Sequence, residues 1–182
     1  MKKYEFTGET KRVELWNRTA TLHRIKATVE FGFVKVGELG GWIEKEENLS
    51  HEGKAWVCGD AEVWGNAKVC GDAEVWGNAE VCGDAEVWGN AKVWGNAEVC
   101  GDAEVFLASH VLVMGSVGSR NDFTTFFRDK DNEITVKCGC FLGKIDKFLE
   151  KVTQTHGNNK YALVYRAAVE VAKLQIELTE RK

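Results

Sequence analysis

A six-residue repeat in the middle of the chain is the feature that most restricts its fold. From Gly53 to Val105 the chain is built of units such as CGDAEV and WGNAKV, with Val at every sixth position and Ala two residues earlier. An Ala-x-Val segment places two apolar side chains on one face of a short strand. Gly followed by Asp or Asn suits a turn with positive φ. An α-helix is excluded because a period of six does not match 3.6 residues per turn.

A strand and a turn every six residues form one side of a triangular coil, so three units complete a coil of 18 residues. We therefore expect a mostly β protein containing a single-stranded parallel β-helix, with coils stacked about 4.8 Å apart. The spacing of aliphatic and small residues favours the left-handed class. Because a solenoid exposes strand edges at both ends, it needs caps. The expected organisation is an N-terminal β cap over 1–51, a hexapeptide β-helix over 52–114 and a C-terminal ββαα domain over 120–182.

The last third of the chain carries the signals for the ββαα unit. Segments 123–127 and 134–137 predict a hairpin, and a helix is expected to end at Gly157, which is a good helix stop. A second helix is expected from about Lys160 to Glu180. Gly-Ser-rich residues 115–119 are the best linker candidate. The second helix is amphipathic through Leu163, Ala167, Val171, Leu174 and Leu178.

The formal net charge of −4 is unevenly distributed along the chain. Residues 52–105 carry 3 basic and 11 acidic groups, a net −8, whereas residues 1–51 sum to +1 and residues 106–182 to +3. Three coils rise about 14 Å, and duplex DNA carries about eight charges over that height. An acidic rod of this kind could compete for the basic channel of a nucleic-acid enzyme. The alternative is that these acids only keep the coils soluble.

Stacking by 18 residues also predicts columns of outward side chains. One column is entirely negative, and the position after each Val alternates mostly between Cys and Trp. These aromatic side chains either shield the turns or contact a partner, because Trp is enriched at interface anchors. The candidate partner-binding residues are Asp60, Glu62, Glu80, Asp84, Glu86, Glu98, Asp102, Glu104, Trp76 and Trp94. The candidate phosphate contacts are Lys137, Lys144, Lys147 and Lys151.

The search for catalytic and metal-binding groups gives little. His110 is the one plausible general base, and no spacing suggests zinc ligands or a cofactor motif. Cys138 and Cys140 could bind a metal or act in redox chemistry, but no second pair accompanies them. The N-terminal residues lack the apolar core of a signal peptide, so we expect a cytoplasmic protein with reduced thiols. Cys82 lies over Cys100, close enough for a disulfide, although a cytoplasmic location argues against one.

Three stretches carry a resemblance to a known family. KYEFTGET, GELGGWIEKEENLSHEGKAWV and the repeated GNAKV and GDAEV units resemble hexapeptide-repeat proteins of unassigned activity from gut Gram-positive bacteria and their phages. The tail with KCGCFLG and THGNNKYA is similar to the tail of that group. The resemblance implies a left-handed β-helix related in shape to the hexapeptide transferases. Phage carriage, overall build and size also suggest similarity to type II anti-CRISPR proteins.

These observations lead to three functional hypotheses. The first is a non-enzymatic protein whose rigid acidic β-helix inhibits a host nucleic-acid-targeting nuclease, such as a type II CRISPR effector. On this hypothesis direct nucleic-acid binding and homo-oligomerisation stay open, and neither a cofactor nor a membrane is involved. The second is a hexapeptide-type acyltransferase with His110 as the base. The third is a structural or self-assembling β-solenoid.

Overall fold

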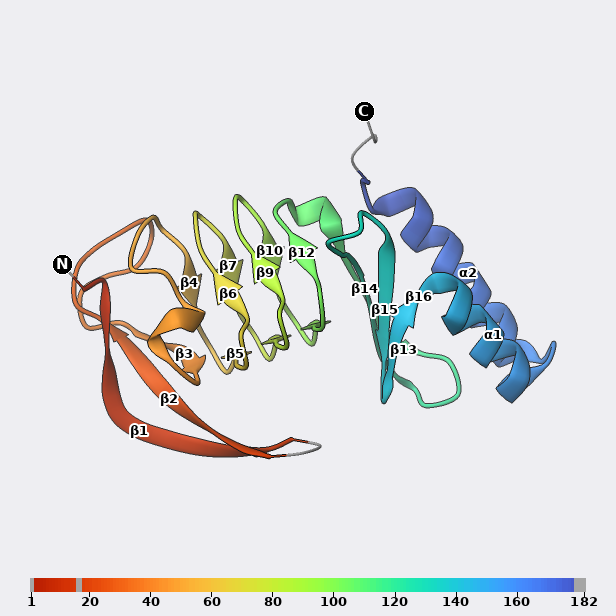
Figure 1. Cartoon of the computed structure of the whole chain (residues 1–182), viewed down its shortest axis with the longest axis horizontal. Coiled ribbons are helices and arrows are strands. Elements are labelled where there is room, and N and C mark those ends of the chain that lie inside the picture. The colour runs from red at the N-terminus through yellow and green to blue at the C-terminus, as the bar shows by residue number, and fades with distance from the viewer. Residues whose placement is uncertain (1, 16–17, 179–182) are drawn as a thin grey trace.

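The computed structural model describes residues 2–15 and 18–178 of the chain. Figure 1 shows an elongated molecule in which short strands stack into a column of coils. A long N-terminal hairpin leaves one end of the column, and a small sheet with two helices lies at the other end. The hexapeptide segment therefore forms the body that joins two terminal units.

The column is a parallel β-solenoid with coils of 18 residues, as the repeat predicts. Its strands form three parallel rows, ordered β4-β7-β10, β5-β8-β11 and β6-β9-β12. Within each row every residue pairs with the residue 18 positions later, as Val63 does with Val81. The strands are β4 (Trp56–Val57), β5 (Glu62–Val63), β6 (Lys68–Val69), β7 (Glu74–Val75), β8 (Glu80–Val81), β9 (Glu86–Val87), β10 (Lys92–Val93), β11 (Glu98–Val99) and β12 (Glu104–Val105).

The interior of the column is made by the Ala and Val positions of the repeat. From Ala55 to Val105 these side chains are buried and belong to one continuous apolar cluster. Glycine is needed at the corners for two reasons. At Gly83 the backbone has a φ of +72°, and a Cβ atom there would lie 2.8 Å from the backbone nitrogen of Gly101 in the next coil. Larger residues would therefore strain the turn and separate the coils.

The N-terminal unit shares a sheet with the column. Strands β1 (Tyr4–Glu14) and β2 (Thr19–Ala27) form an antiparallel hairpin, and β3 (Leu39–Ile43) pairs antiparallel with β2 and parallel with β5. The resulting six-stranded sheet has the order β1-β2-β3-β5-β8-β11. A 3-10 helix (Glu46–Asn48) follows β3, and Leu49 bridges Val69 in parallel. Coil stacking thus begins before the first hexapeptide unit.

The C-terminal unit has more strands than the sequence indicates. After a 3-10 helix (Ala108–His110), strands β13 (Val111–Val117), β14 (Asp122–Arg128), β15 (Ile134–Cys138) and β16 (Phe141–Lys144) form a four-stranded antiparallel sheet. The predicted hairpin corresponds to β14 and β15. Strand β13 includes part of the expected linker. Its alternate residues serve two cores: Val111 and Val113 pack on the solenoid core, whereas Leu112 and Met114 pack beneath the helices.

Two helices cover the outer face of this sheet. Helix α1 (Ile145–His156) is followed by Gly157, as expected, and α2 (Lys160–Gln175) begins after Asn159, whose side chain accepts hydrogen bonds from two backbone amides. The expected extension of this helix to about Glu180 is wrong, because α2 ends at Gln175 and the backbone of Ile176 is extended. Glu180 itself lies outside the described residues. The apolar stripe predicted on α2 is the exposed face, and the buried face consists of Ala162, Tyr165, Ala168, Val169 and Ala172. Within residues 2–15 and 18–178, neither helix is long and apolar enough to cross a bilayer.

Two alanine substitutions separate turn strain from coil-to-coil contact. Gly95 has a φ of +69°, and a Cβ atom added there would meet no other atom within 4 Å, whereas Gly83 faces the next coil. Gly95→Ala should lower the free energy of unfolding by about 1–2 kcal/mol through left-handed strain alone. We expect Gly83→Ala to lower the free energy of unfolding by at least about 1 kcal/mol more than Gly95→Ala does, because at Gly83 the two coils must also move apart. Urea unfolding measures both, and equal losses would show that the stacking at Gly83 is not tight.

Candidate functional site

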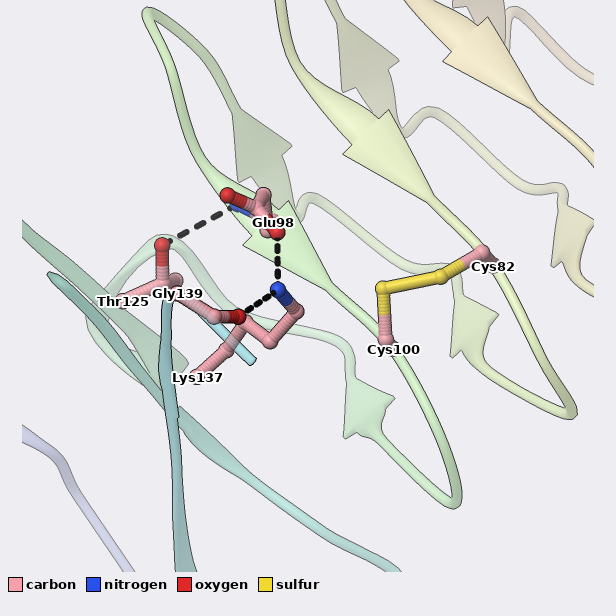
Figure 2. The surroundings of a disulfide bond; sticks show 6 residues. All are labelled: Cys82, Glu98, Cys100, Thr125, Lys137 and Gly139. Carbon is pink, nitrogen blue, oxygen red and sulfur yellow. Dashed lines mark hydrogen bonds and ion pairs between the residues drawn. A yellow bond between two sulfur atoms is a disulfide. The ribbon is translucent and has the colours of Figure 1, made fainter. Parts of the chain in front are cut away.

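The all-negative column forms as predicted, but its ends are neutralised by the terminal units. Glu62 pairs in register with Glu80, and Glu80 with Glu98. Lys11 from β1 places its Nζ 2.6 Å from a carboxylate oxygen of Glu62. Lys137 from β15 forms an ion pair with Glu98, as Figure 2 shows. Two of the three carboxylates are therefore occupied within the chain.

Glu80 lies between these two ion pairs and is half-buried. Burial raises the pKa of its carboxyl above the usual value, and the flanking carboxylates of Glu98 and Glu62 raise it further. The ammonium groups of Lys137 and Lys11 oppose that shift. The ionised Glu80 carboxylate therefore lowers the free energy of unfolding.

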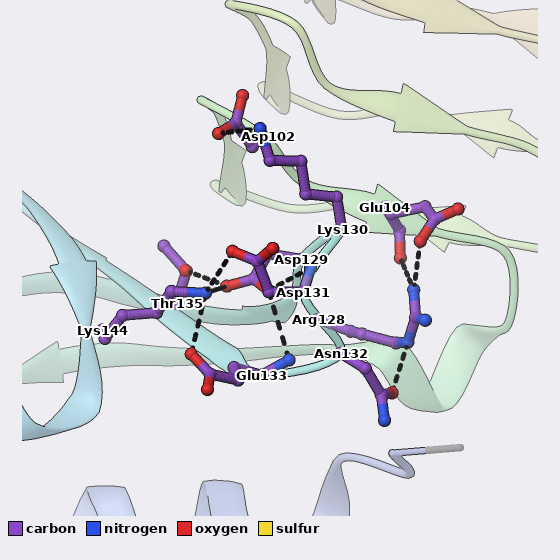
Figure 3. Close-up of polar contacts among 10 residues, drawn as sticks. All are labelled: Asp102, Glu104, Arg128, Asp129, Lys130, Asp131, Asn132, Glu133, Thr135 and Lys144. Carbon is purple, nitrogen blue, oxygen red and sulfur yellow. Dashed lines mark hydrogen bonds and ion pairs between the residues drawn. The ribbon is translucent and has the colours of Figure 1, made fainter. Parts of the chain in front are cut away.

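Other acids of the column are also paired with the terminal units. The Arg128 guanidinium lies 2.8 Å from a carboxylate oxygen of Glu104, and the Lys130 ammonium lies 2.8 Å from Asp102 (Figure 3). On the opposite terminal unit, Arg24 approaches Asp60 at 3.9 Å. Asp60, Glu62, Glu98, Asp102 and Glu104 are therefore paired with cations of the terminal units, and each exposed pair of this kind contributes little stability by itself.

A buried aspartate organises the turn that carries these two cations. Asp129 accepts hydrogen bonds from the Thr135 hydroxyl, the Lys144 ammonium and the backbone amides of Asp131 and Glu133 (Figure 3). Although burial opposes ionisation, these donors hold the pKa of Asp129 below its usual value. The sequence pattern predicts only the hairpin of segments 123–127 and 134–137, between which this turn lies. The alternation of acid and base in that turn is the signal that could have identified the contact.

Four of the predicted acids come together around one depression. Asp84, Glu86, Asp102 and Glu104, with Lys130, line a hollow of about 390 Å³ formed by two successive coils. Asp84 also accepts a hydrogen bond from the Asn66 side chain, and the Lys68 ammonium lies 3.4 Å from Glu86. The other predicted acids, Asp60, Glu62, Glu80 and Glu98, do not line this hollow. We call the four carboxylates of the hollow, Asp84, Glu86, Asp102 and Glu104, the acidic face.

The outward aromatic residues have two different roles. Trp64 packs with Ala20, Leu22 and Trp42 of the N-terminal unit and so shields the column. Trp76 and Trp94 instead stack on each other with ring centroids 6.3 Å apart and planes 12° apart. Trp94 is 59% exposed, so this pair could contact a partner. The pair occupies a different corner of the coil from the acidic face.

The candidate phosphate-binding lysines do not form a free cationic surface. Lys137 is paired with Glu98, Lys144 with three carboxylates, and Lys147 lies 2.9 Å from Glu150. Lys151 is exposed on α1. Three of the four ammonium groups thus have carboxylate partners in the chain, which weakens the case for direct phosphate binding there.

His110 has the surroundings of a structural residue. Its side chain is 2% exposed, its Nδ1 accepts a hydrogen bond from the Phe106 amide, and its ring lies edge-on to Phe106. Burial lowers the pKa of its imidazole, and the nearby Arg128 guanidinium lowers it further. A base for acyl transfer must reach its substrate, so this position favours packing over catalysis.

The expectation of six reduced cysteines is wrong for one pair. Cys82 and Cys100, at a sequence separation of 18, form a disulfide with their Cα atoms 4.6 Å apart (Figure 2). Coil stacking brings equivalent positions within the Cα range that a disulfide requires. The Cys138 thiol accepts a hydrogen bond from Thr124, and Cys140 is exposed. Among the described residues, no three His, Cys, Asp or Glu side chains are grouped as metal ligands would be.

Comparisons with known proteins add no family assignment. No model of a known protein family matches the chain, and no curated protein matches it significantly. The parallel β-solenoid is therefore established by the structure of the chain itself, and the function must be argued from its geometry.

Glu80→Gln should stabilise the protein at neutral pH. Folding raises the pKa of Glu80, so the ionised carboxylate lowers the free energy of unfolding at pH values above the folded-state pKa. This loss of stability disappears below the unfolded-state pKa of about 4.3, where the carboxyl is protonated in both states. Thermal unfolding should therefore show a higher Tm for Glu80→Gln at pH 7.5 and no difference near pH 3.5. Glu74→Gln is the matched control, because Glu74 is paired with Lys92 at 3.5 Å. A Tm gain in the control as large as that of Glu80→Gln would contradict this account.

Proposed function

We propose that this chain is a non-catalytic binding protein whose acidic face enters the cationic groove in which a nuclease holds nucleic acid. The observation that supports this proposal is the gathering of Asp84, Glu86, Asp102 and Glu104 around one hollow on a stiff column. Complementary charge of this kind steers association and selects partners with basic grooves.

The column is suited to present these charges because they are fixed before binding. Successive coils are about 4.8 Å apart, so carboxylates at equivalent positions form regular rows along the column. The strands beneath the acidic face are paired in register, as Glu86 is with Glu104. A surface that is already ordered loses little entropy on binding. The acidic face is smaller than the sequence charge suggests, since Asp102 and Glu104 also hold Lys130 and Arg128.

A type II CRISPR effector is the first target to test. The resemblance of the chain to phage hexapeptide-repeat proteins motivates this choice, since such an effector carries a positively charged channel for its heteroduplex. On this proposal the chain inhibits cleavage by occupying that channel, and no bond is made or broken.

A structural role is the second candidate, and one observation favours it. The N-terminal hairpin is continuous with the sheet of the column, and the C-terminal sheet is fixed to the last coil. The Glu98 amide donates to the Thr125 hydroxyl at 3.0 Å, and Ala103 bridges Asp129. The solenoid is therefore a spacer that holds two units at a fixed separation. The same contacts cover the last coil, which disfavours assembly by end-to-end stacking.

The binding proposal is tested with guide-loaded type II CRISPR nuclease in pull-down and cleavage assays. We expect the parent chain to bind and inhibit, with affinity falling as salt is raised. Asp84→Asn with Glu86→Gln should weaken binding at least about tenfold. Asp72→Asn with Glu74→Gln is the matched control, because it changes net charge equally but leaves the acidic face intact. Absence of binding would reject this target, and equal losses in both variants would reject the acidic face.

A further inference from the structure

The three corners of the last two coils are held together in different ways. At two corners aromatic rings stack with centroids 6.3 and 4.6 Å apart, in the pairs Trp76–Trp94 and Trp88–Phe106. At the third corner the equivalent positions are Cys82 and Cys100, which form the disulfide. Two corners are therefore held by ring contacts, whereas the third is held by a covalent bond that depends on the redox state.

The disulfide corner lies within the attachment of the C-terminal unit to the column. The amide of Glu98, two residues before Cys100, donates to the Thr125 hydroxyl at 3.0 Å (Figure 2). Two residues after Cys100, the Asp102 carbonyl accepts the Lys130 amide at 3.0 Å. The Asp102 carboxylate also lies 2.8 Å from the Lys130 ammonium. We call these contacts of Glu98 and Asp102 with the C-terminal unit the joint.

Coil stacking keeps the two cysteines together in either redox state. The Cys82 amide donates to the Val99 carbonyl at 3.0 Å, and the Asp84 amide donates to the Gly101 carbonyl at 3.0 Å. These backbone bonds do not involve sulfur, so they remain when the disulfide is reduced. The two thiols then stay within the range at which the bond forms again. Reduction and reoxidation therefore need no unfolding of the column.

The disulfide borders solvent on one side. Both cysteines are 5% exposed, and Cys100 lines an open hollow of about 250 Å³. The hollow is also lined by three aspartates and one lysine, Asp102, Asp129, Asp131 and Lys144 (Figure 3). The excess of carboxylates opposes the approach of an anionic reagent. A neutral thiol therefore fits this route better than a negatively charged one.

We propose that Cys82 and Cys100 form a reversible redox site whose bond fixes the C-terminal unit on the last coil. The co-reactant is a dithiol. One of its thiolates attacks a sulfur of the bond, which breaks and releases the other cysteine as a thiolate that takes up a proton. The second thiol of the reagent then displaces the mixed disulfide. The protein gains two electrons and two protons, and the reagent becomes a cyclic disulfide. Exchange with a small-molecule disulfide reverses the reaction.

Reduction is expected to act on the joint rather than on the whole column. The cross-link joins residues at a sequence separation of 18 and restricts the conformations open to the last coil. Without it, this corner has only two small thiols, whereas the other corners keep their stacked rings. The last coil should therefore open locally more often. This inference does not depend on the proposed function, because it concerns the attachment of one terminal unit.

Amide hydrogen exchange by NMR, on the oxidised chain and on the chain reduced with dithiothreitol, tests this redox site. The amides of Glu98 and Lys130 should exchange at least about tenfold faster after reduction, because both bonds belong to the joint. The amides of Trp56 and Asp60, which donate between the first coils, should change less than about twofold. Addition of glutathione disulfide should restore the slow exchange at the joint.

Two double variants separate the disulfide from the other thiols. Cys82→Ser with Cys100→Ser should show fast exchange at the joint with or without dithiothreitol. Cys58→Ser with Cys70→Ser is the matched control, because it removes two free thiols from equivalent corner positions and keeps the disulfide. The control should respond to dithiothreitol as the parent does. Reduction of the parent by neutral 2-mercaptoethanol should also be faster than reduction by anionic 2-mercaptoethanesulfonate.

Three results would overturn the proposal. The first is unchanged exchange at Glu98 and Lys130 after reduction. The second is an equal acceleration along the whole column, which would indicate a general loss of stability instead of an effect on the joint. The third is a disulfide that dithiothreitol reduces only in denaturant, which would make it a permanent structural bond.

Discussion

Coil-on-coil stacking is the interaction on which the rest of this structure depends. Below the last coil, outward residues of the repeat donate their amides to the next coil, as Glu80 does to Ala97 at 2.8 Å, while Ala and Val fill the interior. Because the offset between bonded residues is constant, equivalent side chains fall into columns. The same register explains the Glu column, the stacked Trp pair and the Cys82–Cys100 disulfide. None of these features requires a separate explanation.

The distribution of charge is best understood as a device for attaching the terminal units. A column of like charges destabilises neighbouring strands, yet here cations from both ends of the chain reach it. Lys11 of the N-terminal hairpin pairs with Glu62 and Lys137 of the C-terminal sheet pairs with Glu98. Arg128 and Lys130 of the C-terminal unit pair with two further acids of the solenoid, Glu104 and Asp102. The acid excess of the repeat therefore overstates the charge available to a partner. Within the acidic face itself, Glu86, Asp102 and Glu104 are paired with Lys68, Lys130 and Arg128.

The sequence was sufficient for the solenoid because a repeat with fixed period constrains every coil in the same way. It was insufficient where one segment serves two cores. Strand β13 alternates between the solenoid core and the helix core, so its run of apolar residues resembles a fading repeat. Helix α2 is apolar on two faces. The face with the larger side chains was predicted to be buried, but it is the exposed one. The core instead takes Ala162, Ala168 and Ala172, whose small side chains let the helix approach the sheet. The ion pairs of the acidic columns join residues far apart in sequence, such as Lys11 with Glu62 and Lys137 with Glu98, so the sequence pattern did not identify which acid each cation contacts.

Amide hydrogen exchange by NMR tests the register of the coils most directly. The amides of Glu80, Cys82 and Asp84 donate to Ala97, Val99 and Gly101 of the next coil, so slow exchange should recur with the six-residue period along the column. Backbone amides at the corner glycines should exchange faster than these neighbours. Uniformly fast exchange across residues 56–105, or an unbroken block of protection typical of a helix, would contradict the stacked solenoid and everything built on it.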